Sequence, residues 1–184
     1  PPELRLHGVA CRTAAHAARA NPRAKQTDWL ADRSRFSRTA EPEDSSESAR
    51  EEPYEWLLLD DDGRILEGGS SNFYAIVSKG GKPDGGEMRP RGAVLRTAGE
   101  GVLLGIARSI VLEIAPEIVS VRLEAPLGSE IGHMQEAFLS SASRGIIPVV
   151  EIDGREIGDG TPGPVTHTLI QHYDRRALEL EEPL

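Results

Sequence analysis

One stretch of this 184-residue chain constrains the fold more than any other. It begins with a mostly apolar run over 55–60, turns at Asp61-Asp62-Gly63 and continues through 64–67. An Asp-Gly turn between two short runs of this kind is typical of a β-hairpin. A tight bend, Gly68-Gly69-Ser70-Ser71, then precedes a third apolar run over 72–77. The stretch therefore predicts three strands joined by two short connections.

The rest of the chain supplies further strands and two helices. Alternating or apolar runs predict strands over 4–12, 93–97, 119–124, 137–140 and 146–151, and a hairpin at 152–157. Apolar residues at helical spacing predict a helix from Ile106 to Ala115, ended by Pro116, and a second helix from Val165 to Leu178. We also expect a helical turn within 13–20 and a short helix over 23–30. Together these patterns predict an α/β or α+β fold of about seven or eight strands with two main helices.

Composition excludes several classes of protein. The 30 acidic residues outnumber the 21 Lys and Arg and give a net charge of −9, so a nucleic-acid backbone would be repelled. No apolar run approaches the ~20 residues of a membrane span, and no signal-peptide pattern opens the chain. The single cysteine, Cys11, excludes an internal disulfide framework, and the five histidines show no metal-ligand spacing. We expect no metal, no nucleic-acid or membrane partner and a cytoplasmic location.

The organisation expected is a single domain over 1–184. Two polar stretches, 37–52 and 78–92, are predicted to be mobile loops. The chain begins Pro-Pro-Glu without an initiator methionine, which favours a fragment of a longer protein. An organellar location therefore stays open, because a targeting segment would lie upstream of Pro1.

Four features could carry chemistry, and each also has an ordinary structural explanation. Lys25 lies among apolar neighbours, where a lysine can lose its proton and form an imine with an aldehyde, although a lone lysine is usually a surface residue. Glu67 ends a hairpin strand beside two glycines, a common place for an exposed carboxylate. Gly105 and Ile106 start the strongest predicted helix, where free N–H groups favour a phosphate. The Ser-rich turn 140–143 offers hydroxyl groups and turn amides.

In this order along the chain, the features resemble the class IV pyridoxal-phosphate aminotransferases. That family includes branched-chain aminotransferases, D-amino acid aminotransferases and aminodeoxychorismate lyases. The resemblance covers roughly residues 19–175, and its most specific blocks are 57–74, 105–108, 137–149, and 152–154 together with 160–166. It implies the large domain of the fold-type IV enzymes, a β-rich pseudo-barrel with flanking helices.

The resemblance also implies a cofactor, pyridoxal 5′-phosphate, and roles for particular residues. Lys25 matches the lysine that binds the cofactor covalently and moves the substrate's α-proton. Glu67 matches the acid that keeps the pyridine nitrogen protonated. The other implied cofactor contacts are Ser71, Asn72, Gly105, Ile106, Ala107, Ser141 and Ala142. The turn Ser141-Ala142-Ser143 matches the place where family members bind the substrate carboxylate.

The reaction implied is transamination between an amino acid and a 2-oxo acid, carried out by a homodimer. Some residues depart from the family pattern: Ala107 and Ala142 stand where a Thr is common, and Leu104 stands where a Pro is common. The family's small N-terminal domain has no counterpart in this sequence. Two alternatives therefore stay open: a lyase that uses the same cofactor on aminodeoxychorismate, and a catalytically silent form of the same scaffold. Intact Lys25 and Glu67 argue against the silent form.

Overall fold

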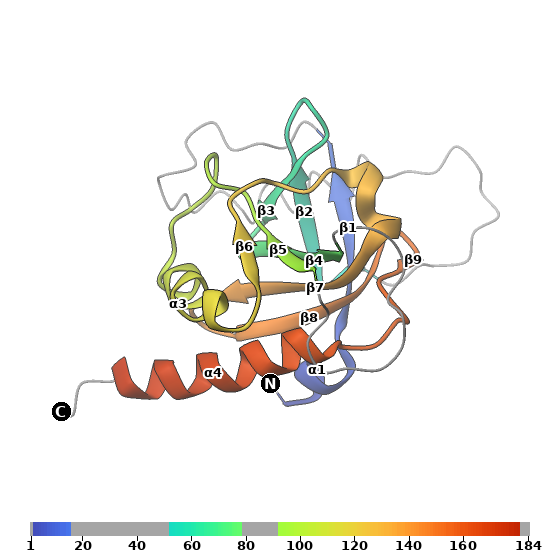
Figure 1. Cartoon of the computed structure of the whole chain (residues 1–184). Helices are drawn as coiled ribbons and strands as arrows, with labels where there is room; N and C mark the ends of the chain where they lie inside the picture. Colours follow the sequence, from blue (N-terminus) through green and yellow to red (C-terminus); the bar gives the residue numbers. More distant parts are fainter. Residues whose placement is uncertain (1, 16–51, 79–91, 181–184) are drawn as a thin grey trace.

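The computed structural model describes residues 2–15, 52–78 and 92–180. Within these ranges, nine strands form one sheet, and helices lie outside it (Figure 1). The strands are β1 (Val9–Ala14), β2 (Glu55–Leu59), β3 (Ile65–Gly68), β4 (Asn72–Ser78), β5 (Ala93–Arg96), β6 (Ser120–Arg122), β7 (Met134–Ser141), β8 (Gly145–Ile152) and β9 (Arg155–Glu156). The helices are α1 (Pro2–His7), α3 (Ile106–Ile114) and α4 (Pro164–Leu180), with 3-10 turns η1 (Ala115–Glu117) and η2 (Gly128–His133).

Six of the strands close into a barrel, in the order β3-β2-β1-β8-β7-β4. The ring closes because β3 pairs with β4, with Glu67 opposite Asn72. Strand β1 runs parallel to both of its neighbours, β2 and β8, whereas the other pairs of the ring are antiparallel. The sheet continues beyond β4 into β5 and β6, and β9 forms a hairpin with β8.

Two apolar cores lie on the two faces of this sheet. Along β4 the side chains alternate: Phe73 and Ala75 belong to one core, whereas Tyr74 and Ile76 belong to the other. The core of Tyr74 and Ile76 also contains residues of α3 and α4, so it lies between the sheet and the helices. The core of Phe73 therefore fills the inside of the barrel. Figure 1 shows α4 lying along the barrel beneath β8, with α3 beside it.

The structure confirms the strands predicted at 55–60, 64–67, 72–77, 93–97 and 146–151, as well as both main helices. Strand β6 is shorter than predicted, and β7 begins three residues earlier than predicted. The prediction for 4–12 is wrong in its first half, because Pro2–His7 is the helix α1. Gly8, with φ +74°, separates this helix from β1, and a side chain there would clash with Val150.

Other predictions fall on residues that the structure does not describe. Residues 37–51 and 79–91 of the two predicted loops lie outside the described ranges, as does the short helix expected over 23–30. Of the helical turn expected within 13–20, Thr13 and Ala14 instead belong to β1. Ser78, the first residue of the second predicted loop, belongs instead to β4.

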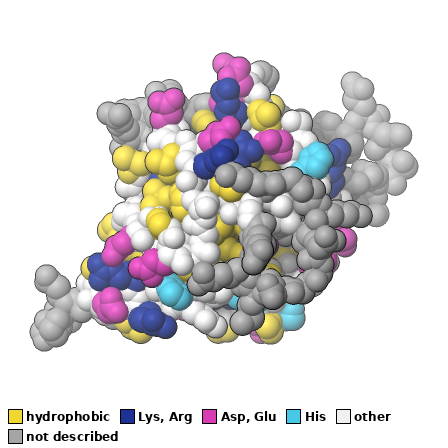
Figure 2. Space-filling view, in the orientation of Figure 1, with side chains coloured by type: hydrophobic (Ala, Val, Ile, Leu, Met, Phe, Trp, Pro, Cys, Tyr) yellow, Lys and Arg dark blue, Asp and Glu magenta, His cyan; other side chains and the backbone are white. Residues whose placement is uncertain are grey.

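The described surface carries charges of both signs together with exposed apolar side chains. Figure 2 shows acidic and basic side chains interspersed on one face of the molecule. None of the helices in the described ranges combines the length and apolar character needed to span a membrane. In the same ranges, no three His, Cys, Asp or Glu side chains gather in a way that could hold a metal ion.

Candidate active site

Glu67 is a buried carboxylate at the junction of β3 with β4. Its residue is only 2% exposed, and its Oε2 accepts a hydrogen bond of 3.1 Å from the backbone N–H of Leu103. Asn72, its partner across the strand pair, donates from Nδ2 to the carbonyl of Leu103 at 2.9 Å. Burying a carboxylate is costly unless hydrogen bonds compensate it. Glu67 of β3 and Asn72 of β4 are therefore both hydrogen-bonded to the segment that leads into α3.

The start of α3 lies two residues beyond that contact. Gly105 is the N-cap, with an extended backbone (φ −76°, ψ 158°) and no side chain that could cap the helix. The amides of the first helical turn, including those of Ile106 and Ala107, therefore have no partner within the helix. Oδ1 of Asn72 would lie 3.7 Å from a Cβ on Gly105, so the amide side chain is close to this helix end. A helix start of this kind favours an anion.

A buried arginine fixes the orientation of α3. Arg108 is 2% exposed, and it donates to Thr97 Oγ1 at 2.9 Å and to the carbonyl of Ala98. Thr97 in turn donates to the carbonyl of Phe73 at 2.8 Å. The first turn of the helix is thus tied to the end of β5 and to β4, both of which belong to the sheet.

Two short connections lie beside each other at the end of the barrel where β3 leads into β4. The bend 68–71 joins β3 to β4, and the turn 142–144 joins β7 to β8. They are neighbours because Asn72, the first residue of β4, pairs with Ser140 near the end of β7. The hydroxyl of Ser140 is hydrogen-bonded to that of Tyr74 at 2.9 Å, and burial raises the pKa of Tyr74 to about 12. The phenol beneath the turn is therefore protonated at neutral pH.

Sequence reasoning missed the arginine that connects these two segments. Arg144 Nε donates to Ser141 Oγ at 3.0 Å, and Nη2 donates to Ser70 Oγ at 2.7 Å. Arg144 also forms an ion pair of 3.4 Å with Glu55, whose Oε2 accepts a hydrogen bond from Ser71 Oγ at 3.4 Å. Only the charge of Arg144 within a Ser-rich turn could have drawn attention to it, because its partners on β2 and on the bend are far away in the sequence.

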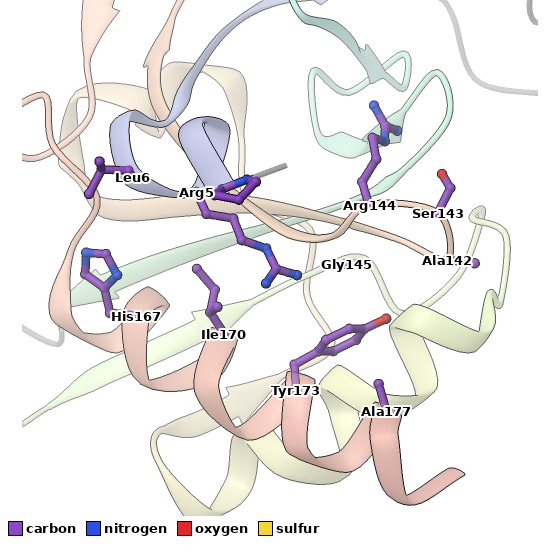
Figure 3. A pocket seen from close by; sticks show the side chains of 11 residues that line it. Arg5, Leu6, Ala142, Ser143, Arg144, Gly145, His167, Ile170, Tyr173 and Ala177 are labelled. Atoms are coloured by element: carbon purple, nitrogen blue, oxygen red, sulfur yellow. The ribbon is translucent and has the colours of Figure 1, made fainter. Parts of the chain in front are cut away.

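The turn also has a second, outward side. Ala142 and Ser143 are exposed, and they line a pocket of about 690 Å³ between α1 and α4 (Figure 3). Arg5 and Tyr173 lie across this pocket from the turn, and Arg5 is paired with Asp174 at 2.6 Å. In Figure 3 the side chain of Arg144 points away from the pocket, toward the bend.

The structure thus gathers most of the residues predicted from the sequence at one end of the barrel. Contacts link Glu67 and Asn72 to the segment before Gly105, and they link the bend to Ser141. Lys25 lies outside the described residues, so its distance from Glu67 stays a prediction.

The described residues fit the cofactor implied by the sequence. The buried carboxylate of Glu67 suits a protonated ring nitrogen, because a carboxylate is an acceptor. The uncapped start of α3 suits a phosphate. Both features meet at Leu103, whose amide binds Glu67 and which precedes Gly105 by two residues. Glu67 and the start of α3 therefore lie close together. Glu67 suits the ring nitrogen of a phosphorylated pyridine, and the helix start suits its phosphate.

Comparison with known proteins agrees with this reading. The model of the family described as amino-transferase class IV matches residues 6–152. A protein of Aquifex aeolicus named "Probable branched-chain-amino-acid aminotransferase" is 34% identical over 121 residues, which are 65% of this chain and 35% of that protein. The D-alanine aminotransferase of Staphylococcus haemolyticus is 31% identical over 113 residues, which are 60% of this chain and 36% of that protein.

Solved structures share the fold. The branched-chain aminotransferase of Thermoproteus uzoniensis, solved with norvaline, superposes with a TM-score of 0.70 at 23% identity over 97% of this chain and 54% of that one. The corresponding Escherichia coli enzyme gives a TM-score of 0.61 at 24% identity over 90% of this chain and 51% of that one. Another branched-chain aminotransferase of the same fold was solved with pyridoxamine 5′-phosphate.

The chain spans about a third of the length of the two curated relatives above and about half of the solved chains. The family model nevertheless matches most of the chain, including every described strand of the barrel. The closed six-stranded barrel and its flanking helices confirm the fold that the sequence resemblance implied. On this evidence the chain belongs to the class IV aminotransferases, a family of pyridoxal-phosphate enzymes.

Proposed function

We propose that this chain forms the cofactor-holding part of an aminotransferase that uses pyridoxal 5′-phosphate. The substrates proposed are an amino acid and a 2-oxo acid, of the kind used by branched-chain or D-amino acid aminotransferases. The observation that carries the proposal is the buried carboxylate of Glu67, hydrogen-bonded to Leu103 just before the uncapped start of α3. The names of the relatives support the same class of reaction.

Each residue of the candidate site would have a separate role. Glu67 would hold a proton on the ring nitrogen, and the amides of Ile106 and Ala107 would bind the phosphate. Lys25 would hold the cofactor covalently and move the proton at the substrate's Cα. When bound, the cofactor would supply an electron-poor ring that accepts the electrons of the broken Cα–H bond.

The turn 141–143 is the proposed site for the substrate carboxylate. It lies beside the bend that follows Glu67, and its amides and hydroxyls are donors of the type that a carboxylate accepts. We further propose that the working assembly is a homodimer, as the family resemblance implies. Sedimentation of the chain in solution tests that part of the proposal separately.

The chain contains three lysines: Lys25, Lys79 and Lys82. After incubation with pyridoxal 5′-phosphate and reduction with borohydride, peptide mass spectrometry should find the pyridoxyl group on Lys25, since only a lysine held at the cofactor's aldehyde is labelled efficiently. Lys25→Ala should abolish labelling, whereas Lys79→Ala should not change it.

Two results would contradict the proposal. Labelling of Lys79 or Lys82 instead of Lys25 would remove the assigned lysine, and no labelling at saturating cofactor would favour a catalytically silent scaffold. If Lys25 is labelled, a panel of amino acids with pyruvate or 2-oxoglutarate as acceptor tests the reaction. Release of pyruvate from aminodeoxychorismate without an acceptor would instead assign the lyase.

A further inference from the structure

We propose that Arg144 is a positioning residue that holds the substrate-carboxylate turn in register with the bend beside Glu67. The inference rests on the proposed function, because it assigns the turn 141–143 to the substrate. Nothing in the sequence resemblance gives this arginine a role.

The turn and the bend both extend beyond the paired strands. The last pair between β7 and β8 is Ser141 with Gly145, and the pairing of β4 begins at Asn72. Residues 142–144 of the turn and residues 69–71 of the bend therefore lie past the ends of these ladders. The turn is closed by a hydrogen bond of 3.3 Å from the Arg144 amide to the Ser141 carbonyl, which is longer than the usual 2.9–3.0 Å. The bend has backbone hydrogen bonds of its own, from the Gly68 amide to the Ser71 carbonyl at 2.7 Å and from the Gly69 amide to the Trp56 carbonyl at 2.9 Å. The side chain of Arg144 links it to the turn.

Arg144 binds both segments with one guanidinium group. Its Nε donates to Ser141 Oγ, and its Nη2 donates both to Ser70 Oγ at 2.7 Å and to the Ser70 carbonyl at 3.3 Å. A planar group with five donors in fixed directions can connect two backbones in one geometry. A lysine ammonium in the same place would act as a point charge without that geometry.

The guanidinium of Arg144 is itself held in place by residues of β2 and of the segment before it. Glu55 Oε2 lies 3.4 Å from Nη2, and the Tyr54 hydroxyl accepts from Nη1 at 3.2 Å. The guanidinium carbon also lies 5.4 Å from the centre of the Tyr54 ring, within the range of a cation–π contact. The side chains of Arg144 and Glu55 are only 25% and 11% exposed, so this ion pair is better shielded than a surface pair.

The bend also packs closely against Glu55 and is hydrogen-bonded to it. A Cβ on Gly68 would lie 2.9 Å from Cγ of Glu55, and Oε2 of Glu55 also accepts from Ser70 Oγ at 2.7 Å. Arg144 and Glu55 therefore both bind the bend through the hydroxyl of Ser70. Since Glu67 directly precedes this bend, the arginine fixes the distance between the carboxylate-binding turn and the ring-nitrogen acid.

The test compares Arg144→Ala with a matched control, Arg176→Ala. Arg176 also carries an ion pair, to Glu113 at 2.8 Å, but it lies on α4 outside the candidate site. With the cofactor-loaded chain, Arg144→Ala should raise the KM for the amino-acid donor about tenfold and leave kcat within about threefold, because only the placement of the carboxylate site is lost. Arg144→Lys should recover only part of the lost affinity, and Arg176→Ala should leave both constants unchanged.

Amide hydrogen exchange provides a readout that does not depend on activity. In Arg144→Ala, peptides covering 68–72 and 140–145 should exchange faster together, whereas peptides of α3 should keep the wild-type rate. If the wild-type chain proves inactive, the proposed function fails and exchange alone decides whether Arg144 couples the two segments. An unchanged KM in an active enzyme, or faster exchange in only one of the two segments, would overturn the inference.

Discussion

Cys11 shows how strongly the barrel changes the chemistry of a single side chain. It lies in β1 and is 1% exposed, inside the core that fills the barrel. Burial raises the pKa of its thiol far above the ordinary value, and the nearby carboxylate of Glu55 raises it further. A thiol with a raised pKa is a poor nucleophile because the thiolate is the reactive form. We therefore expect Cys11 to be an inert core residue.

This raised pKa gives a prediction about alkaline stability. The unfolded thiol ionises near pH 9.0, whereas the folded thiol does not ionise there, so protons are lost only from the unfolded state. The free energy of unfolding should therefore fall above pH 9, by up to about 1.4 kcal/mol per pH unit. Urea titrations at pH 8, 9 and 10 measure this slope.

Cys11→Ala is the control for that slope, since it removes the ionising group. Tyr74 is also a buried acid with a raised pKa, but its ordinary value of 10.0 means that its effect begins at higher pH. An equal slope between pH 9 and 10 in wild type and Cys11→Ala would show that the thiol is not the cause.

At the scale of single elements, α4 depends on a carboxylate from another strand. Glu136 of β7 is 7% exposed and accepts hydrogen bonds from the amides of Val165 at 3.0 Å and Thr166 at 2.7 Å. These amides belong to the first turn of α4, where a negative charge also interacts favourably with the helix dipole. Gly163 makes room for this contact, because a Cβ there would lie 2.2 Å from Cδ of Glu136.

Removing this cap should destabilise the protein. Glu136→Ala leaves two buried helix amides without their acceptor, so we expect a loss of about 2 kcal/mol in the free energy of unfolding. Chemical denaturation at pH 7, followed by circular dichroism, measures the change. Glu117→Ala, an exposed glutamate in η1, should change stability by less than about 0.5 kcal/mol. Equal losses in the two variants would exclude a specific capping role.

The elements that the sequence predicts best are those with local signals. The Asp61-Asp62-Gly63 turn and the Gly105 helix start need only neighbouring residues, and both are present in the structure. The helix α1 was missed because Leu4 and Leu6 alternate as in a strand, although Leu6 is 65% exposed. The contacts of Arg144 with residues 74 and 90 positions away depend on the barrel, which no local pattern reveals.

At the scale of the whole molecule, the candidate site lies where the barrel and a helix meet. Glu67 and Asn72 are opposite each other in the β3–β4 pair, and both bind Leu103 before α3. The site could be expected from the order of its motifs in the sequence. The position of the site at the junction of β3 with β4 could not be predicted from the sequence, because closure of the barrel depends on the pairing of all six strands.

We expect cofactor binding to stabilise this junction. At a free cofactor concentration of 100 times Kd, binding to the folded state alone adds about 2.7 kcal/mol to the free energy of unfolding. The added protection from amide exchange should be largest in peptides covering 65–72 and 103–107, and α4 should change least. Release of the cofactor from Lys25 with hydroxylamine, followed by dialysis, should reverse the effect. Protection concentrated in α4 would place the ligand elsewhere.

The parallel strand β1, held between β2 and β8, has a consequence for the order of assembly. Strands β2, β3 and β4 follow one another through short connections, so they can pair soon after collapse begins. The contact of β1 with β8 joins opposite ends of the sequence, and its loop-closure entropy makes it a late event. We therefore expect the Glu67–Asn72 pair to form in a partly folded chain, before the docking of β1 onto β8 closes the barrel.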